Sequence, residues 1–126
     1  MPVETITLTP KVLFHHKADG YIIPSDLEDH IESFWKDTKK LGDKVNIIWD
    51  LREANLSNLS FEAVEFLANA ILKSAADYIR PGLTAILIND NPEKHIAAYL
   101  ASLLSSIPGR KIEMFHNYDQ ALQFVQ

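Results

Sequence analysis

The residues best suited to catalysis or ligand binding lie at the end of a mostly apolar segment, residues 45–51. Asp50, Arg52 and Glu53 lie at or just beyond the end of that segment. Ligands of open α/β sheets bind beyond the carboxyl ends of the strands, so these side chains are candidates for a small polar or cationic ligand. His116 follows another strand-like segment, which makes Asp50 and His116 a conceivable acid–base pair.

The alternative for this group is structural: Asp50 and Arg52 bond each other and the backbone of the loop. We favour it because the sequence carries no nucleophile or oxyanion motif. Neither GxGxxG nor a P-loop is present, and the chain has only four glycines. We therefore expect a protein that is not an enzyme and that uses no cofactor.

The five histidines do not have the spacing of a metal site. His15 and His16 are adjacent on an extended segment, so their side chains point to opposite faces. His30, His95 and His116 come from separate elements, without an i,i+4 pair or an HExxH motif. Since the chain also has no cysteine, we expect no metal site.

Ser60 ends the polar loop from Ala54 to Phe61 and opens a helix. Its hydroxyl can cap the helix by accepting a backbone N–H, or it can accept a phosphate that the helix N-terminus would favour. We favour the cap. The loop residues Ser57, Asn58 and Phe61, with the start of the helix, are the expected contact region for a protein partner or a small apolar ligand.

Alternating and apolar runs predict strands at residues 3–9, 12–17, 45–51, 83–89 and 111–116. A turn is expected at residues 18–20. Helices should begin at Ser25, with Glu28 completing a capping box, and then at Ser60, Asn91 and Asn117, which caps with Gln120. The order ββαβαβαβα predicts a layered α/β domain spanning residues 1–126. Its mixed, mostly parallel five-stranded sheet begins with an antiparallel hairpin.

The first helix should place Leu27, Ile31 and Phe34 on its core face, followed by Thr38 and Leu41, and stop at Gly42. Trp35 would then lie at the edge of that face. The apolar residues 21–23 precede the helix. An exposed aromatic patch here would mark a partner surface or a weak membrane contact, and the alternative is an extension of the core.

Composition narrows the class of protein. The 126 residues include 12 Lys and Arg against 17 Asp and Glu, a net charge of −5 that disfavours nucleic-acid binding. The first residues lack the basic and apolar regions typical of a signal peptide, so none is expected, and no apolar run approaches the roughly 18 residues of a membrane span. We expect a soluble cytoplasmic protein, with a homodimer left open.

Four segments together resemble the SpoIIAA-like (STAS) domain family over nearly the whole chain. They are VLFHHKADGYIIPSDLEDHIESFW, KVNIIWDLREANLSNLS, GLTAILIN and KIEMFHNYDQALQFV. The resemblance implies a STAS-like fold and a bacterial regulatory protein. In the family's anti-sigma-factor antagonists, an Asp-Ser-Ser-Gly loop carries a serine that a partner kinase phosphorylates.

This chain reads Asn58-Leu59-Ser60-Phe61 at that loop, so only Ser60 matches the motif. The resemblance therefore implies a divergent subgroup that lacks the phosphorylation motif. Our first expectation is a module that regulates by binding a protein partner or a small apolar ligand. The alternatives are a switch phosphorylated on Ser60 and a peripheral membrane or lipid-binding protein.

Overall fold

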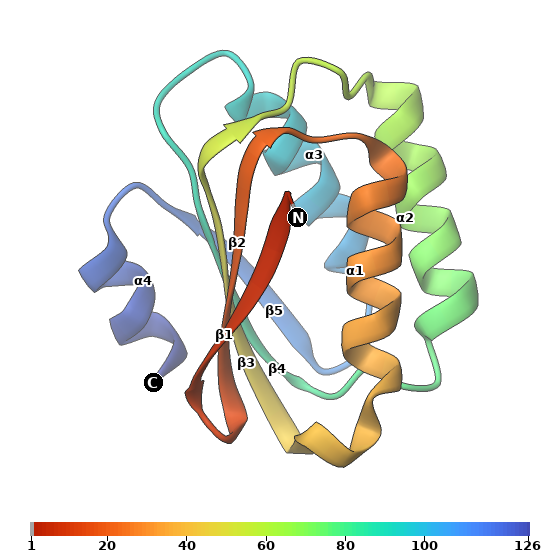
Figure 1. Ribbon diagram of the computed structural model, residues 1–126, viewed down its shortest axis with the longest axis vertical. Coiled ribbons are helices and arrows are strands. Elements are labelled where there is room, and N and C mark those ends of the chain that lie inside the picture. The colour runs from red at the N-terminus through yellow and green to blue at the C-terminus, as the bar shows by residue number, and fades with distance from the viewer. Residues whose placement is uncertain (1) are drawn as a thin grey trace.

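The computed structural model describes residues 2–126, which form one five-stranded sheet and four α-helices (Figure 1). The strands are β1 (Val3–Thr9), β2 (Lys11–Tyr21), β3 (Leu41–Asn55), β4 (Gly82–Leu87) and β5 (Arg110–Phe115). The helices are α1 (Pro24–Lys36), α2 (Phe61–Ala75), α3 (Lys94–Leu104) and α4 (Tyr118–Val125), with a short 3₁₀ turn at Thr38–Lys40.

The strands lie side by side in chain order, β1-β2-β3-β4-β5. β1 is antiparallel to β2, and β2 through β5 are parallel to one another. The predicted hairpin, the mostly parallel sheet and the order ββαβαβαβα are therefore confirmed. Because β2 to β5 run the same way, their carboxyl ends meet at one edge of the sheet, the upper edge in Figure 1.

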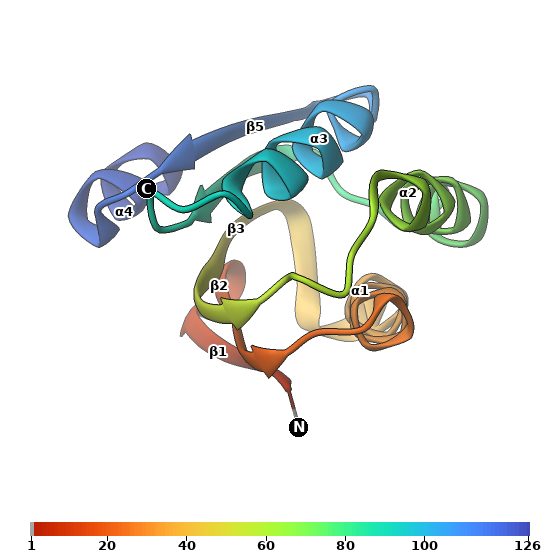
Figure 2. The same cartoon turned by 90° about the horizontal axis from the view of Figure 1, so that it is seen from above.

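Helices α1, α2 and α3 cover one face of the sheet, and α4 covers the other (Figure 2). The central strand β3 serves both layers because its side chains alternate between faces. Ile47, Trp49 and Leu51 contact the core beneath the three helices, whereas Ile48 packs with Ala85 and the α4 residues. β3 therefore contributes side chains to both cores and leads to the loop at the upper edge of the sheet.

Strand β2 is longer than predicted, because residues 18–20 continue it instead of turning. Ala18 is fully buried and pairs with Val3, and pairing with β3 extends as far as Tyr21 opposite Asn55. Gly20 has a φ of 74°, a conformation that favours glycine. This glycine therefore allows an irregularity within the strand and does not form the expected turn. β3 is likewise longer, running from Leu41 to Asn55.

Helix α1 differs from its prediction at both ends. It begins at Pro24, whose missing N–H costs nothing at a first helical position, and no side chain caps it, so the Ser25 capping box does not form. It ends at Lys36, and Leu41 is a buried residue of β3. Leu27, Ile31 and Trp35 are the buried residues of α1, so the placement of Trp35 at the edge is wrong.

The later helices follow the sequence more closely. In α2 the apolar residues Val64, Leu67, Ile71 and Ala75, which recur at helical spacing, are buried. α3 begins at Lys94 and not at the expected cap Asn91, whose side chain accepts the N–H of Glu93 in the preceding turn. The most buried residues of α3 are Ala97 and Ala101, and its larger apolar residues are half-buried: Ile96, Tyr99, Leu100, Leu103 and Leu104. Asn117 caps α4 as predicted, by accepting the N–H of Gln120.

Candidate functional site

The loop between β3 and α2 crosses the upper edge of the sheet toward the helices (Figures 1 and 2). It alternates between the interior and the solvent. Leu56 and Leu59 are buried against the core, whereas Ser57, Asn58 and Ser60 are exposed. The loop therefore has an apolar inner side and a polar outer side.

Hydrogen bonds hold this loop in place. The Leu56 N–H donates to the Glu93 carboxylate over 3.0 Å, which fastens the loop to the start of α3. The Ser57 N–H donates to the Asn55 side chain over 3.0 Å, and the Leu59 N–H to the Leu56 carbonyl over 2.9 Å. These three bonds anchor the backbone of the loop within the fold.

Ser60 is the N-cap of α2, as the sequence predicts. Its Oγ accepts the N–H of Ala63 over 3.0 Å, and the side chain is exposed. Phe61 follows with 53% of its surface exposed and lies edge-on to Tyr99, with ring centroids 5.3 Å apart. The Tyr99 hydroxyl donates to Glu65, which links α3 to α2 beside the loop.

Asp50 lies on the other face of the sheet, away from the loop. Its buried carboxylate accepts two bonds of 2.9 Å from the Arg52 guanidinium, one of 3.2 Å from the Arg52 N–H, and one of 3.2 Å from His15 Nε2. His15 in turn packs against Tyr118 of α4. This is the structural arrangement that we favoured for Asp50 and Arg52, and Glu53 beside them is exposed.

These contacts control the charge of the pair. Burial alone would raise the pKa of the Asp50 carboxyl, but the bonds from Arg52 and His15 outweigh burial and hold that pKa well below its usual range. The same bond raises the pKa of Arg52. Asp50 is therefore a fixed carboxylate, which makes it a poor proton carrier near neutral pH.

Asp50 and His116 are not brought together. The ring of His116 bonds through Nδ1 to the Ile88 carbonyl over 2.7 Å, and the Asp50 carboxylate is occupied by His15 and Arg52. The Asn89 side-chain amide donates to the Arg52 carbonyl over 2.9 Å, which joins the segment after β4 to β3. The proposed acid–base pair is absent from residues 2–126.

His16 points to the opposite face from His15, as predicted, and lies in a buried aromatic cluster. Its Nδ1 is 2.8 Å from Thr5 Oγ1 and 3.1 Å from His30 Nε2, and its ring contacts Phe34 and Trp49. Burial, helped by the nearby His30, lowers the pKa of His16 well below its usual value, so the ring is neutral at physiological pH. Nowhere in the described part of the chain do three or more His, Cys, Asp or Glu side chains gather as metal ligands.

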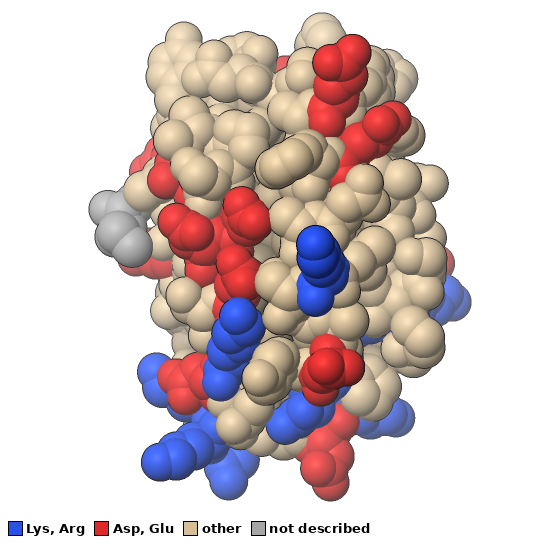
Figure 3. Space-filling view, turned by 90° about the vertical axis from the view of Figure 1, so that its right-hand side faces the viewer, with Lys and Arg blue, Asp and Glu red and all other residues tan. Residues whose placement is uncertain are grey.

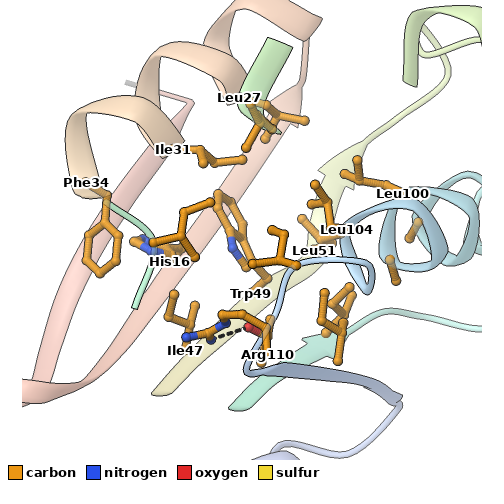
Figure 4. A pocket seen from close by; sticks show the side chains of 18 of the residues that line it. His16, Leu27, Ile31, Phe34, Ile47, Trp49, Leu51, Leu100, Leu104 and Arg110 are labelled. Atoms are coloured by element: carbon orange, nitrogen blue, oxygen red, sulfur yellow. Dashed lines mark hydrogen bonds between the residues drawn. The ribbon is translucent and has the colours of Figure 1, made fainter. Parts of the chain in front are cut away.

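A cavity of about 90 Å³ lies beneath the loop, between the sheet and helices α1 to α3 (Figure 4). Leu56 and Leu59 belong to its wall, which connects it to the predicted contact region. Its lining is aliphatic or aromatic except for His16, Thr84 and Arg110.

Sequence reasoning missed Arg110, Glu93 and the exposed Phe66 of α2. Arg110 follows Pro108-Gly109, which is typical of an exposed turn, yet it is buried. Glu93 lies near the start of a helix, where an acidic residue is ordinarily explained by the helix dipole. Phe66 falls outside the buried stripe of α2, and that position on the helix was the one available signal.

Among residues 2–126, no helix combines the length and the apolar character needed to cross a membrane. No family model and no curated protein sequence matches the chain.

Solved structures similar to this chain include the following two. One is an uncharacterized protein of the DUF3478 family with a SpoIIAA-like fold from Shewanella loihica PV-4, with a TM-score of 0.62 and 13% identity over 98% of this chain and 92% of that one. The other is an anti-sigma factor antagonist from Mycobacterium paratuberculosis, with a TM-score of 0.55 and 17% identity over 98% and 93% of the two chains.

The Asp50 contacts predict a pH-dependent loss of stability. Replacing Asp50 with Asn should lower the free energy of unfolding by about 1–3 kcal/mol at pH 7, because Arg52 and His15 lose the negative charge and one of the two acceptor oxygens. The bonds that depress the pKa of Asp50 stabilise the folded protein fully above the unfolded-state pKa of about 3.9, and this stabilisation is lost progressively as the pH falls from there toward the folded-state pKa. The difference in free energy of unfolding between wild type and Asp50→Asn should therefore become smaller below about pH 4.

Urea unfolding measured from pH 7 to pH 3 tests this. Asp43→Asn, at an exposed position of β3, is the matched control and should change stability by less than about 0.5 kcal/mol throughout. If the stability difference between wild type and Asp50→Asn is constant from pH 7 to pH 3, or is absent at pH 7, the role assigned to Asp50 is wrong.

Proposed function

Because the chain has a SpoIIAA-like fold, we propose that it is a non-enzymatic module that regulates by binding a protein partner. The contact surface is the outer side of loop 54–61 together with the first two turns of α2. Ser57, Asn58 and Phe61 contact the partner directly, and Asp50 with Arg52 holds the end of β3 that carries the loop.

The observation that carries this proposal is the exposure of two aromatic side chains on α2. Phe61 is 53% exposed and Phe66 74%. Large aromatic side chains in contact with water, grouped beside a polar loop, are typical of the anchors that dominate protein–protein binding. Tyr21 and Ile23, also exposed, lie close to the loop because β2 pairs with β3 through Tyr21 and Asn55.

Charge defines the kind of partner. Acidic side chains accompany the aromatic residues on α2, at Glu62 and Glu65, and the neighbouring helix α1 carries Glu28 and Asp29. Figure 3 shows acidic groups over the upper and middle part of this side of the molecule, with basic groups from the middle downward and both signs toward its lower end. A protein surface with an apolar anchor and basic residues around it complements this arrangement. An anionic lipid surface would be repelled, which disfavours the membrane alternative.

The similar structure from Mycobacterium paratuberculosis supports a protein partner, since its name describes an antagonist of another protein. At 17% identity the likeness extends to the fold.

Phosphorylation of Ser60 is the second candidate. Ser60 is exposed at the N-terminus of an α-helix, where a phosphate would be stabilised by the free backbone N–H groups. Against it, Phe61 stands beside Ser60 with an exposed ring that restricts the approach of a kinase.

The partner proposal predicts that two aromatic side chains control retention of the partner. Immobilised wild type should retain a protein from lysate of the source cell, and Phe61→Ser with Phe66→Ser should reduce its retention at least tenfold, since truncating an anchor costs about 2 kcal/mol or more. The control is Tyr78→Ser, which removes an exposed aromatic residue beyond the far end of α2. Quantitative mass spectrometry measures how much of the partner each immobilised protein retains: wild type, the double variant and Tyr78→Ser.

Cross-linking from a photoreactive residue at position 66 should then attach the same retained protein, through a basic segment. Equal retention by wild type and the double variant, with all three proteins equally stable, would contradict the proposed surface.

The Ser60 alternative predicts a phosphorylated form of the intact chain. Incubation with ATP and candidate anti-sigma kinases, followed by mass spectrometry, should show phosphate on Ser60 and none on Ser60→Ala. An unmodified Ser60 with kinases that phosphorylate their own antagonist in parallel would exclude this alternative.

A further inference from the structure

Arg110, the first residue of β5, is a buried cation without an acidic partner. Only 8% of the residue is exposed, and none of the ion pairs formed within residues 2–126 includes it. Its Nη1 donates to the carbonyls of Val45 and Arg80 over 2.6 and 3.0 Å, and its Nη2 donates to Thr84 Oγ1 over 2.6 Å. The guanidinium also lies 5.2 Å from the ring centroid of Trp35.

These contacts do not neutralise the charge. Burial lowers the pKa of Arg110 to about 10, so the guanidinium remains protonated at neutral pH. Carbonyls, a hydroxyl and an aromatic face supply partial negative charge only. Of the five guanidinium N–H groups, Nε–H and one on Nη2 have no acceptor in the described residues.

Arg110 lines the apolar cavity (Figure 4). The other polar groups of the wall are Thr84, which is engaged with Arg110, and His16, whose ring is neutral. The cavity is therefore an apolar space with a single positive charge in its wall. A buried, unpaired charge is normally matched by an opposite charge or removed from the interior.

We propose that the cavity binds a small apolar monocarboxylate, with the carboxylate on Arg110 and the hydrocarbon part among Trp49, Leu100 and Leu104. A carboxylate accepts two N–H groups of a guanidinium side by side, which matches the two donors left over. A neutral apolar molecule would leave the charge unpaired, and a cation would be repelled.

The cavity volume sets the size of the ligand. An apolar cavity of about 150 Å³ holds the six carbon atoms of one benzene molecule, so 90 Å³ suits a hydrocarbon part of roughly three to four carbon atoms. Long-chain lipids exceed this volume. The site is separate from the outer surface of loop 54–61, and the inference does not depend on the proposed partner.

Tryptophan fluorescence and calorimetry with sodium pentanoate test the inference. The chain has two tryptophans, Trp35 and Trp49, and both line the cavity, so the tryptophan fluorescence reports on it. Pentanoate, with four carbon atoms beyond its carboxylate, should bind saturably to the full chain. Pentan-1-ol, which keeps the hydrocarbon part, and acetate, which keeps the charge, should each bind at least tenfold more weakly.

Two substitutions separate charge from shape. Arg110→Met should weaken pentanoate binding at least tenfold and bring it to the level of pentan-1-ol. Arg80→Met, which removes a positive charge outside the cavity wall, is the matched control and should bind as wild type does. Ala101→Leu fills part of the cavity from α3 while the chain keeps Arg110, and should abolish binding.

Equal binding of pentanoate and pentan-1-ol to wild type, undiminished pentanoate binding by Ala101→Leu, or no saturable signal would overturn the proposal. If Arg110→Met fails to fold, the comparison of the three probes on wild type and the Ala101→Leu result decide it. Circular dichroism of each variant establishes its fold.

Discussion

The inward placement of Leu56 and Leu59 is the constraint on which the rest of the structure depends. A loop leaving the edge of a parallel sheet must satisfy its backbone donors while it moves from strand to helix. Here Glu93, Asn55 and the Leu56 carbonyl accept three of those donors, so the two leucines can close the core. The same geometry turns Ser57, Asn58 and Phe61 outward. The inner side of the loop thus closes the apolar cavity, and its outer side forms the exposed surface.

The cavity results from the residues that α3 presents to the sheet. Ala97 and Ala101 are its most buried positions, and such small side chains leave space that the half-buried Leu100 and Leu104 only border. Arg110 forms part of the cavity wall. It joins β3 through Val45, β4 through Thr84 and α1 through Trp35, so the cation that gives the cavity its chemistry also holds three elements together. Arg110 therefore has a structural role in addition to the role in ligand binding that we propose for it.

Much of the fold could be predicted from the sequence because it follows from local patterns. Hydrophobic periodicity gave the order of strands and helices, and Ser60 and Asn117 were identifiable as caps from their neighbours alone. The pairing of Asp50 with Arg52 was also foreseen, since residues two apart on one strand face the same way. The ends of α1 and β2 were misplaced because tertiary contacts decide them: Leu41 is needed in β3, and Ala18 is needed between β1 and β3.

The candidate site was less predictable for the same reason. Trp35 and Phe34 compete for one helix face, and the outcome depends on Arg110, 75 residues later in the chain, whose guanidinium lies over the indole ring. The cavity has no sequence pattern, because it is the space that separate elements fail to fill. Glu93 reaches back 37 residues to Leu56, a contact that no local rule anticipates.

Hydrogen–deuterium exchange of the free protein, read residue by residue by NMR, tests most directly whether the loop is a fixed wall between two sites. The amides of Leu56, Leu59 and Ala63 should exchange far more slowly than those of an unstructured chain, because each donates within the fold. The amide of Asn58, at the exposed tip, serves as the internal comparison. Exchange of the first three amides at unprotected rates would show a loop that is ordered only by its partner, and would contradict the account.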